Sequence, residues 1–102
     1  MIKETTILSG QDDTQTYDSV DAFFTAHGLE DWRAKELKLF TDAGFDVTDS
    51  AKQQVAMNED GTKVVITVAY ADQAEKDSIF ENVVAGDGPD ALVEELSEDH
   101  LF

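Results

Sequence analysis

The sequence predicts an α+β fold in a single domain, residues 1–102, in which a small antiparallel sheet packs with about four helices. Two runs of alternating apolar residues flank Asp60-Gly61, which is typical of a β-hairpin. Other segments carry apolar residues at the i, i+3, i+4 spacing of helices. The predicted sheet combines an N-terminal strand with the 52–70 hairpin, and the predicted element order is β-α-α-β-β-α-α.

The first half of the chain is predicted to form a strand and two helices. Residues 2–8 are rich in Thr and Ile, which favours a strand. A helix follows an N-cap at Asp18 or Ser19, and Gly28 ends it in the position of a left-handed cap. A second helix is predicted over Glu30–Ala43. The expected inner faces are Val20, Phe23, Phe24 and His27 in the first helix, and Leu29, Trp32, Leu37, Phe40 and Ala43 in the second, which Gly44 ends.

The hairpin is the most specific local prediction. Strands over 52–58 and 63–70 flank Asp60-Gly61, a dipeptide suited to a type I′ turn. Centring the turn there places five apolar residues and one glutamine on a single face, and a slip by one residue would lose this match. The expected pairs are Met57 with Val64, Val55 with Ile66, and Gln53 with Val68.

The last third of the chain is predicted to form two further helices. Asp72 is a suitable N-cap for a third helix that extends to about Ala85, and Gly86-Asp87-Gly88 interrupts it. Pro89 then occupies the first turn of a short last helix, where its missing N–H costs nothing. The expected apolar stripe of that last helix is Leu92, Val93 and Leu96.

Catalytic motifs are missing, so the sequence predicts a protein that is not an enzyme. No serine lies in a G-x-S-x-G motif, and the chain has no cysteine. His27 falls on the apolar stripe of the first helix near its C-terminus, which favours a structural role. His100 lies in a tail that is expected to fray. With 23 acidic residues, close carboxylate pairs arise by chance.

Ligand-binding motifs are weak, and no cofactor is predicted. Residues 86–90 open a helix as a phosphate loop does, but they carry acids where an anion would bind. Asp42, Asp46 and Asp49, or residues 58–60, offer oxygen atoms suited to Ca²⁺ or Mg²⁺. Neither run fits the D-x-[DN]-x-[DN]-G calcium loop, so a divalent-ion site stays a third-ranked alternative.

Acidity is the strongest functional signal. The chain has 23 acidic and 7 basic residues, a net charge of −16, and Asp77 to Phe102 holds eight carboxylates without Lys or Arg. Solubility asks for a net charge of only roughly 2–8, and self-repulsion opposes folding. Nucleic acids and anionic membranes would repel this chain. The expected partner is therefore a basic protein surface, with no direct nucleic-acid or membrane binding.

These observations predict a non-enzymatic acidic interaction protein, in its sharpest form a DNA-mimic-like inhibitor or modulator of a nucleic-acid-binding protein. Sixteen charges occupy roughly 27 Å of duplex, a length close to the size of such a domain. Its size and charge resemble those of small phage-encoded inhibitors of host nucleic-acid enzymes, an analogy of type without residue correspondence. The predicted partner-binding residues are Asp77, Glu81, Asp87, Asp90, Glu94, Glu95, Glu98 and Asp99.

The alternative is a structural or assembly protein that binds through apolar contacts, its acidity reflecting a salt-adapted or generally solvated surface. An exposed patch of Phe23, Phe24, Trp32 or Phe102 would favour this function. Six of the seven basic residues are lysine, which argues against salt adaptation. A cytoplasmic location is expected because the N-terminus lacks a signal-peptide run and no stretch approaches the roughly 18 apolar residues of a membrane span.

Overall fold

The structure, a computed structural model, describes residues 1–12, 14–80 and 92–102 of the chain. Within these residues, one antiparallel sheet of four strands in the order β2-β3-β1-β4 is accompanied by three helices, which confirms the α+β class. The elements are β1 (Ile2–Gly10), α1 (Val20–Ala26), α2 (Glu30–Asp42), β2 (Gln53–Met57), β3 (Lys63–Tyr70), α3 (Gln73–Phe80) and β4 (Leu92–Ser97).

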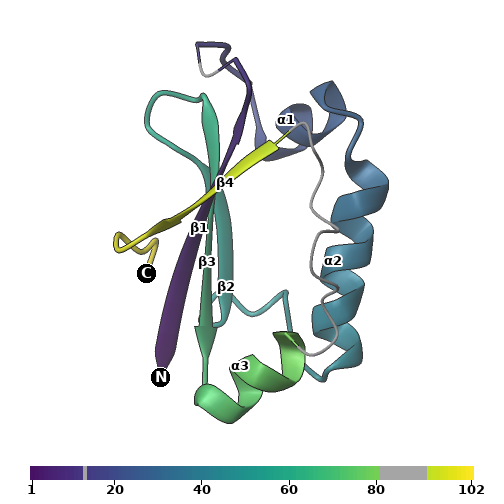
Figure 1. The fold of residues 1–102 in the computed structure, drawn as a ribbon, viewed down its shortest axis with the longest axis vertical. Helices are drawn as coiled ribbons and strands as arrows, with labels where there is room; N and C mark the ends of the chain where they lie inside the picture. The colour runs from purple at the N-terminus through teal and green to yellow at the C-terminus, as the bar shows by residue number, and fades with distance from the viewer. Residues whose placement is uncertain (13, 81–91) are drawn as a thin grey trace.

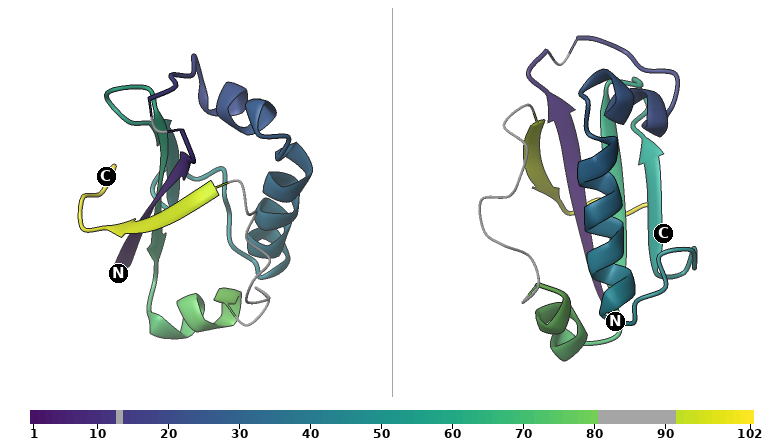
Figure 2. Two further views of the ribbon diagram at one scale, coloured as in Figure 1. Left: turned by 45° about the horizontal axis from the view of Figure 1, so that its top comes forward. Right: turned by 90° about the vertical axis from the view of Figure 1, so that its right-hand side faces the viewer.

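The helices lie on one face of the sheet. Helix α2 runs lengthwise along that face (Figure 2, right), and α3 lies across the end where β1 begins (Figure 1). Two apolar clusters fill the space between sheet and helices, one around Phe23 and the other around Phe45 and Tyr70. Trp32 near the start of α2 packs on the first cluster, and Phe40 near its end packs on the second. Helix α2 thus bridges both clusters, although none of its residues is fully buried.

The strand and two helices predicted for the first half of the chain are present, but Ala43, predicted on the inner face of the second helix, is exposed just after it. The predicted strand is present and extends to Gly10. Ser19 caps α1, because its Oγ accepts a hydrogen bond from the Ala22 amide at 3.0 Å. Gly28 and Gly44 follow the two helices with φ of 67° and 83°, a left-handed conformation that favours glycine.

The hairpin has the predicted register and a different turn. All three expected pairs are present. The strands are joined by residues 58–62, in which the Gly61 amide donates to Asn58 O at 3.1 Å. Asn58 Oδ1 also accepts from the amides of Thr62 (2.9 Å) and Lys63 (3.1 Å). The type I′ prediction is wrong because that turn needs positive φ at both central residues, and only Gly61 has it.

The predicted last helix is wrong. Residues 92–97 form strand β4, which pairs antiparallel with β1 from Gly10↔Leu92 to Thr5↔Ser97. The observed order is therefore β-α-α-β-β-α-β in the described residues. The physical reason lies in long-range contacts: pairing with β1 satisfies the inner backbone groups of β4, and Leu92 joins the buried cluster that contains Phe23 and Phe24.

The third predicted helix is confirmed over its first half. The Glu75 amide donates to Asp72 Oδ1 at 2.8 Å, so Asp72 is the cap that the sequence indicated. Helix α3 is described to Phe80. The predicted continuation to Ala85, the 86–88 interruption and Pro89 lie outside the described residues.

The C-terminal tail, residues 98–102, covers part of the outer face of the sheet, which is the face opposite the helices (Figure 1). Thr5 Oγ1 lies 2.7 Å from both Thr67 Oγ1 and His100 Nδ1, and the Leu101 amide donates to Thr67 Oγ1 at 3.0 Å. The expectation of a fraying tail with an idle His100 is therefore wrong. The two threonines are buried, and buried hydroxyls need hydrogen-bond partners, which the tail supplies.

Candidate functional site

The structure places four of the predicted partner-binding acids on or just after β4. Glu94 pairs with Leu8 and Glu95 with Ile7 on the neighbouring strand. Successive side chains of a strand point to opposite faces, so these two carboxylates do not form the single row that a helix would give. Glu98 and Asp99 follow in the tail, and all four residues are exposed.

The other predicted acids do not extend this group into a described row. Asp77 is exposed on α3, where its Oδ1 accepts a hydrogen bond from Gln73 Nε2 at 2.9 Å. Glu81, Asp87 and Asp90 lie outside the described residues. The four remaining predicted acids are the candidate site and are called the β4 acidic edge, defined as Glu94, Glu95, Glu98 and Asp99.

Three basic side chains of the protein pair with acids other than those of the β4 acidic edge. Arg33 contacts Asp21 at 2.7 Å, Lys38 contacts Asp42 at 2.8 Å, and Lys76 contacts Glu4 at 2.6 Å. The hydrogen bond and charge of Asp42 raise the pKa of Lys38. These contacts neutralise acids on the helices and on β1.

One cation near the tail was missed by sequence reasoning. Lys3 Nζ donates to the Phe102 carbonyl oxygen at 2.8 Å and lies 5.5 Å from the centre of its ring. Because β4 pairs with β1, the first residues of the chain lie next to the last ones. Recognising the C-terminal strand would have revealed this proximity.

The carboxylates considered as metal ligands already bind groups of the protein, mostly in their own turns. Asp46 Oδ1 accepts hydrogen bonds from the Thr48 amide (2.9 Å) and hydroxyl (2.6 Å), which lower the pKa of Asp46. Asp49 Oδ1 accepts from the Ala51 amide at 2.9 Å, and Asp42 pairs with Lys38. In the part of the chain that the structure describes, no three His, Asp or Glu side chains gather as metal ligands.

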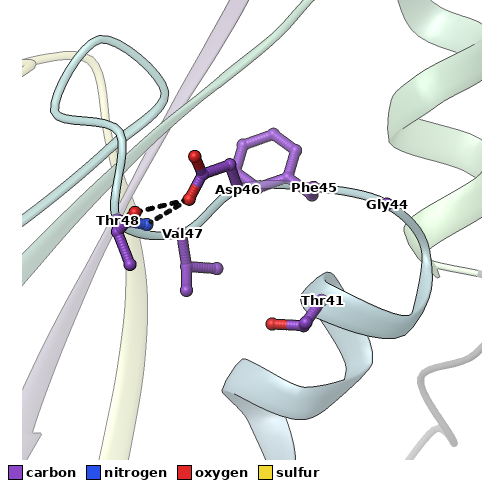
Figure 3. Close-up of a pocket in the computed structure, with 6 residues that line it drawn as sticks. All are labelled: Thr41, Gly44, Phe45, Asp46, Val47 and Thr48. Carbon is purple, nitrogen blue, oxygen red and sulfur yellow. Dashed lines mark hydrogen bonds between the residues drawn. The ribbon is translucent and has the colours of Figure 1, made fainter.

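A shallow depression of about 350 Å³ lies beside the same turn. It is lined by residues at and after the end of α2, and Figure 3 shows the Asp46 carboxylate turned back onto Thr48. The depression is open and holds no titratable side chain besides Asp46. It therefore offers neither the enclosure nor the convergent polar groups of a small-molecule site. Its lining residues are Thr41, Gly44, Phe45, Asp46, Val47 and Thr48.

His27 is built into the core rather than into a reactive site. Its Nδ1 lies 3.0 Å from Phe23 O, and its ring stacks on that of Phe23 with centroids 4.6 Å apart. A Cβ added at Gly10 would lie 2.5 Å from His27 Nε2. The end of β1 therefore requires glycine, because the imidazole occupies the space of a side chain.

The aromatic patch that would have favoured apolar assembly does not form. Phe23 and Phe24 are 0% and 2% exposed, and Trp32 and Phe102 are half-buried. Exposed apolar side chains instead mark the C-terminal strand, where Val93 is 45% and Leu96 is 78% exposed. Apolar and acidic groups therefore share β4.

Comparison with protein-family models, with curated proteins and with solved structures gives no match for this chain. None of the helices in the described residues is long and apolar enough to cross a membrane.

Proposed function

We propose that this protein is a non-enzymatic interaction protein that binds a basic surface on a partner protein through the β4 acidic edge. The observation that carries the proposal is the exposure of Glu94, Glu95, Glu98 and Asp99 in a stretch without Lys or Arg. A surface with unneutralised carboxylates attracts a basic partner and steers its approach at low salt.

The internal use of the basic residues supports this proposal. Lys3 and Lys52 lie over the rings of Phe102 and Phe45, at 5.5 Å in each case. Arg33 lies 4.9 Å from the centre of the Phe24 ring in addition to its contact with Asp21. Arg33 and Lys52 are therefore engaged with other groups of the fold, whereas Lys3 lies beside the tail that carries Glu98 and Asp99.

The partner class that we propose is a nucleic-acid-binding protein, which the chain would inhibit or modulate in the cytoplasm. The longest dimension of the protein is 38 Å. A duplex of that length carries about 22 phosphate charges. The net charge of −16 is of the same order, so the protein presents to a nucleic-acid-binding surface a field comparable with that of the duplex it would displace.

A pull-down from a source or host lysate, at about 100 and 500 mM salt and with competing duplex DNA, tests this function. We expect recovery of a nucleic-acid-binding protein that both salt and DNA displace. The variant Glu94→Lys/Glu95→Lys should lose that protein. Its matched control, Glu59→Lys/Asp60→Lys, makes the same change in net charge at the exposed hairpin loop and should retain it. Equal retention by both variants would remove β4 from the proposal.

A second candidate function is apolar assembly, and the exposure of Val93 and Leu96 favours it. In that case the acids would be a salt-adapted or generally solvated surface. Partners retained at about 500 mM salt and indifferent to DNA would support this second function. The double variant Val93→Ser/Leu96→Ser, rather than the charge reversal, would then release them.

A further inference from the structure

The outer edge of β4 pairs with no other strand in the described residues. Alternate residues of an antiparallel strand direct their backbone N–H and C=O groups to opposite sides. The bond from Ala69 N to Lys52 O, 2.7 Å, shows that the odd-numbered residues of β3 face β2. From the pairing registers it follows that the backbone N–H and C=O groups of the odd-numbered residues of β1 and β4 point toward each other. The backbone groups of Leu92, Glu94 and Leu96 consequently point to the open edge.

The side chains along this edge combine two kinds of recognition. Glu94 and Leu96 share the helix-side face of the sheet, and Val93 and Glu95 share the outer face. Each face thus offers one exposed apolar group next to one exposed carboxylate. The other edge strand, β2, carries no charged residue, and its Gln53 amide already donates to Asp49 O at 3.0 Å.

We propose, resting on the function proposed above, that the outer edge of β4 binds an extended basic segment of the partner protein by strand addition. The partner segment adds a fifth strand whose backbone pairs with Leu92, Glu94 and Leu96. Lys or Arg side chains opposite Glu94 and Glu95 form cross-strand charge pairs, which stabilise a sheet. Exposed edges of this type are templates for pairing with another chain.

Charge also disfavours a second copy of this chain as the binding partner of the edge. If β4 paired with β4 of another molecule in antiparallel orientation, the glutamates at its centre would lie opposite or next to each other. Like charges in directly opposed positions destabilise a sheet, and each molecule carries a net charge of −16. The edge of β4 therefore disfavours pairing with β4 of a second copy and favours pairing with a basic strand.

The first test uses the full-length protein and the peptide Lys-Thr-Val-Lys-Lys-Val-Thr. Its antiparallel alignment places lysines opposite Glu94, Glu95 and Glu98, and valines opposite Val93 and Leu96. One analogue is N-methylated at the first valine and third lysine, whose amides would point to β4. The control analogue is N-methylated at the first threonine and second lysine, whose amides would point away.

We expect the first analogue to bind about 10-fold or more weakly than the control by isothermal titration, as two lost hydrogen bonds predict. We also expect the unmodified peptide to slow hydrogen exchange at the Glu94 and Leu96 amides, read by NMR. Equal affinities of the two analogues, or no binding of the unmodified peptide up to about 1 mM, would overturn strand addition.

A second test acts on the protein. Leu96→Pro removes an N–H that points to the open edge and leaves the bonds to β1 in place, because proline is tolerated at such positions. Leu96→Ala removes the same side chain and keeps the N–H. We expect Leu96→Pro to weaken peptide binding further than Leu96→Ala. If the pull-down partner responds to charge reversal but the two Leu96 variants bind the peptide equally, strand addition fails and the proposed function stands.

Discussion

The contact between Gly10 and His27 gives the sharpest test of the packing. A Cβ on residue 10 would lie 2.5 Å from His27 Nε2, so Gly10→Ala must displace the imidazole. The ring is held by its stacking on Phe23 and by the hydrogen bond of Nδ1 to Phe23 O. Each contact contributes about 0.5–1.5 kcal/mol. Replacing glycine by alanine also stabilises the protein by about 0.4–1 kcal/mol, because it lowers the conformational entropy of the unfolded chain.

Gly10→Ala should therefore lower the free energy of unfolding by about 1–2 kcal/mol. In a chain of this length that corresponds to a Tm lower by about 4–8 °C. Urea unfolding at one fixed salt concentration measures the effect, because the charge of −16 makes stability depend on salt. The diagnostic comparison is the double variant Gly10→Ala/His27→Ala. Without the imidazole, the new methyl group has room, so Gly10→Ala should cost little in that background.

A double-mutant cycle should give a coupling of about 1–2 kcal/mol between positions 10 and 27. Gly44→Ala is the control, because its Cβ meets nothing within 4 Å and its cost comes only from the φ of 83°. That cost should be the same with and without His27. If Gly10→Ala also costs the same in both backgrounds, His27 does not occupy the space beside the end of β1.

Three further predictions concern the outer face, the core and the hairpin. Thr5→Val should lower the free energy of unfolding by about 1–3 kcal/mol, because it leaves the buried Thr67 hydroxyl short of a partner, whereas Thr5→Val/Thr67→Val should lower it less; urea unfolding measures both. Hydrogen exchange at the Leu101 amide should be faster in the double variant, which removes the acceptor of that amide. Burial, with the nearby Glu4 and Glu75 charges, raises the pKa of Tyr70, so the folded state holds the phenol proton more tightly than the unfolded state. Stability should then fall as pH rises above about 10, and Tyr70→Phe should reduce that fall in unfolding experiments on both sides of this pH. Asn58→Ala should lower the free energy of unfolding by about 1–2 kcal/mol in urea, because the loop loses two bonds to Oδ1, while Glu59→Ala should have little effect.

The elements that sequence analysis predicted correctly are those whose signals are local. The register of the hairpin follows from alternation over a few residues on each side of one turn. The cap at Ser19 and the glycines at 28 and 44 are determined by neighbouring residues. The predicted turn type is wrong because of one side chain: Asn58 Oδ1 accepts a hydrogen bond from the Thr62 amide and so stabilises a longer loop.

The C-terminal strand shows what local signals miss. Leu92, Val93 and Leu96 fit the stripe of a helix as well as a strand, and the two central glutamates favour a helix. The strand is stabilised by pairing with β1, which lies more than 80 residues earlier in the sequence, and local signals do not reveal such a partner. The same pairing brings Lys3 and the tail together. Glu94 and Glu95, predicted on the face of a helix, therefore lie on a strand.

The change from helix to strand alters how the charge can act. A row of carboxylates on a helix would attract any basic surface by charge alone. The exposed acids at the hairpin loop and on the helices would then compete with that row for the same basic partner. An edge strand adds backbone groups at a fixed spacing and apolar side chains on both faces. In the proposed complex, charge sets the rate and salt dependence of the encounter, and pairing at the edge determines which segment stays bound. Substitutions at Glu94 and Glu95 should therefore slow association and also speed dissociation, because these carboxylates form the proposed cross-strand charge pairs, whereas substitutions at Leu96 should mainly speed dissociation.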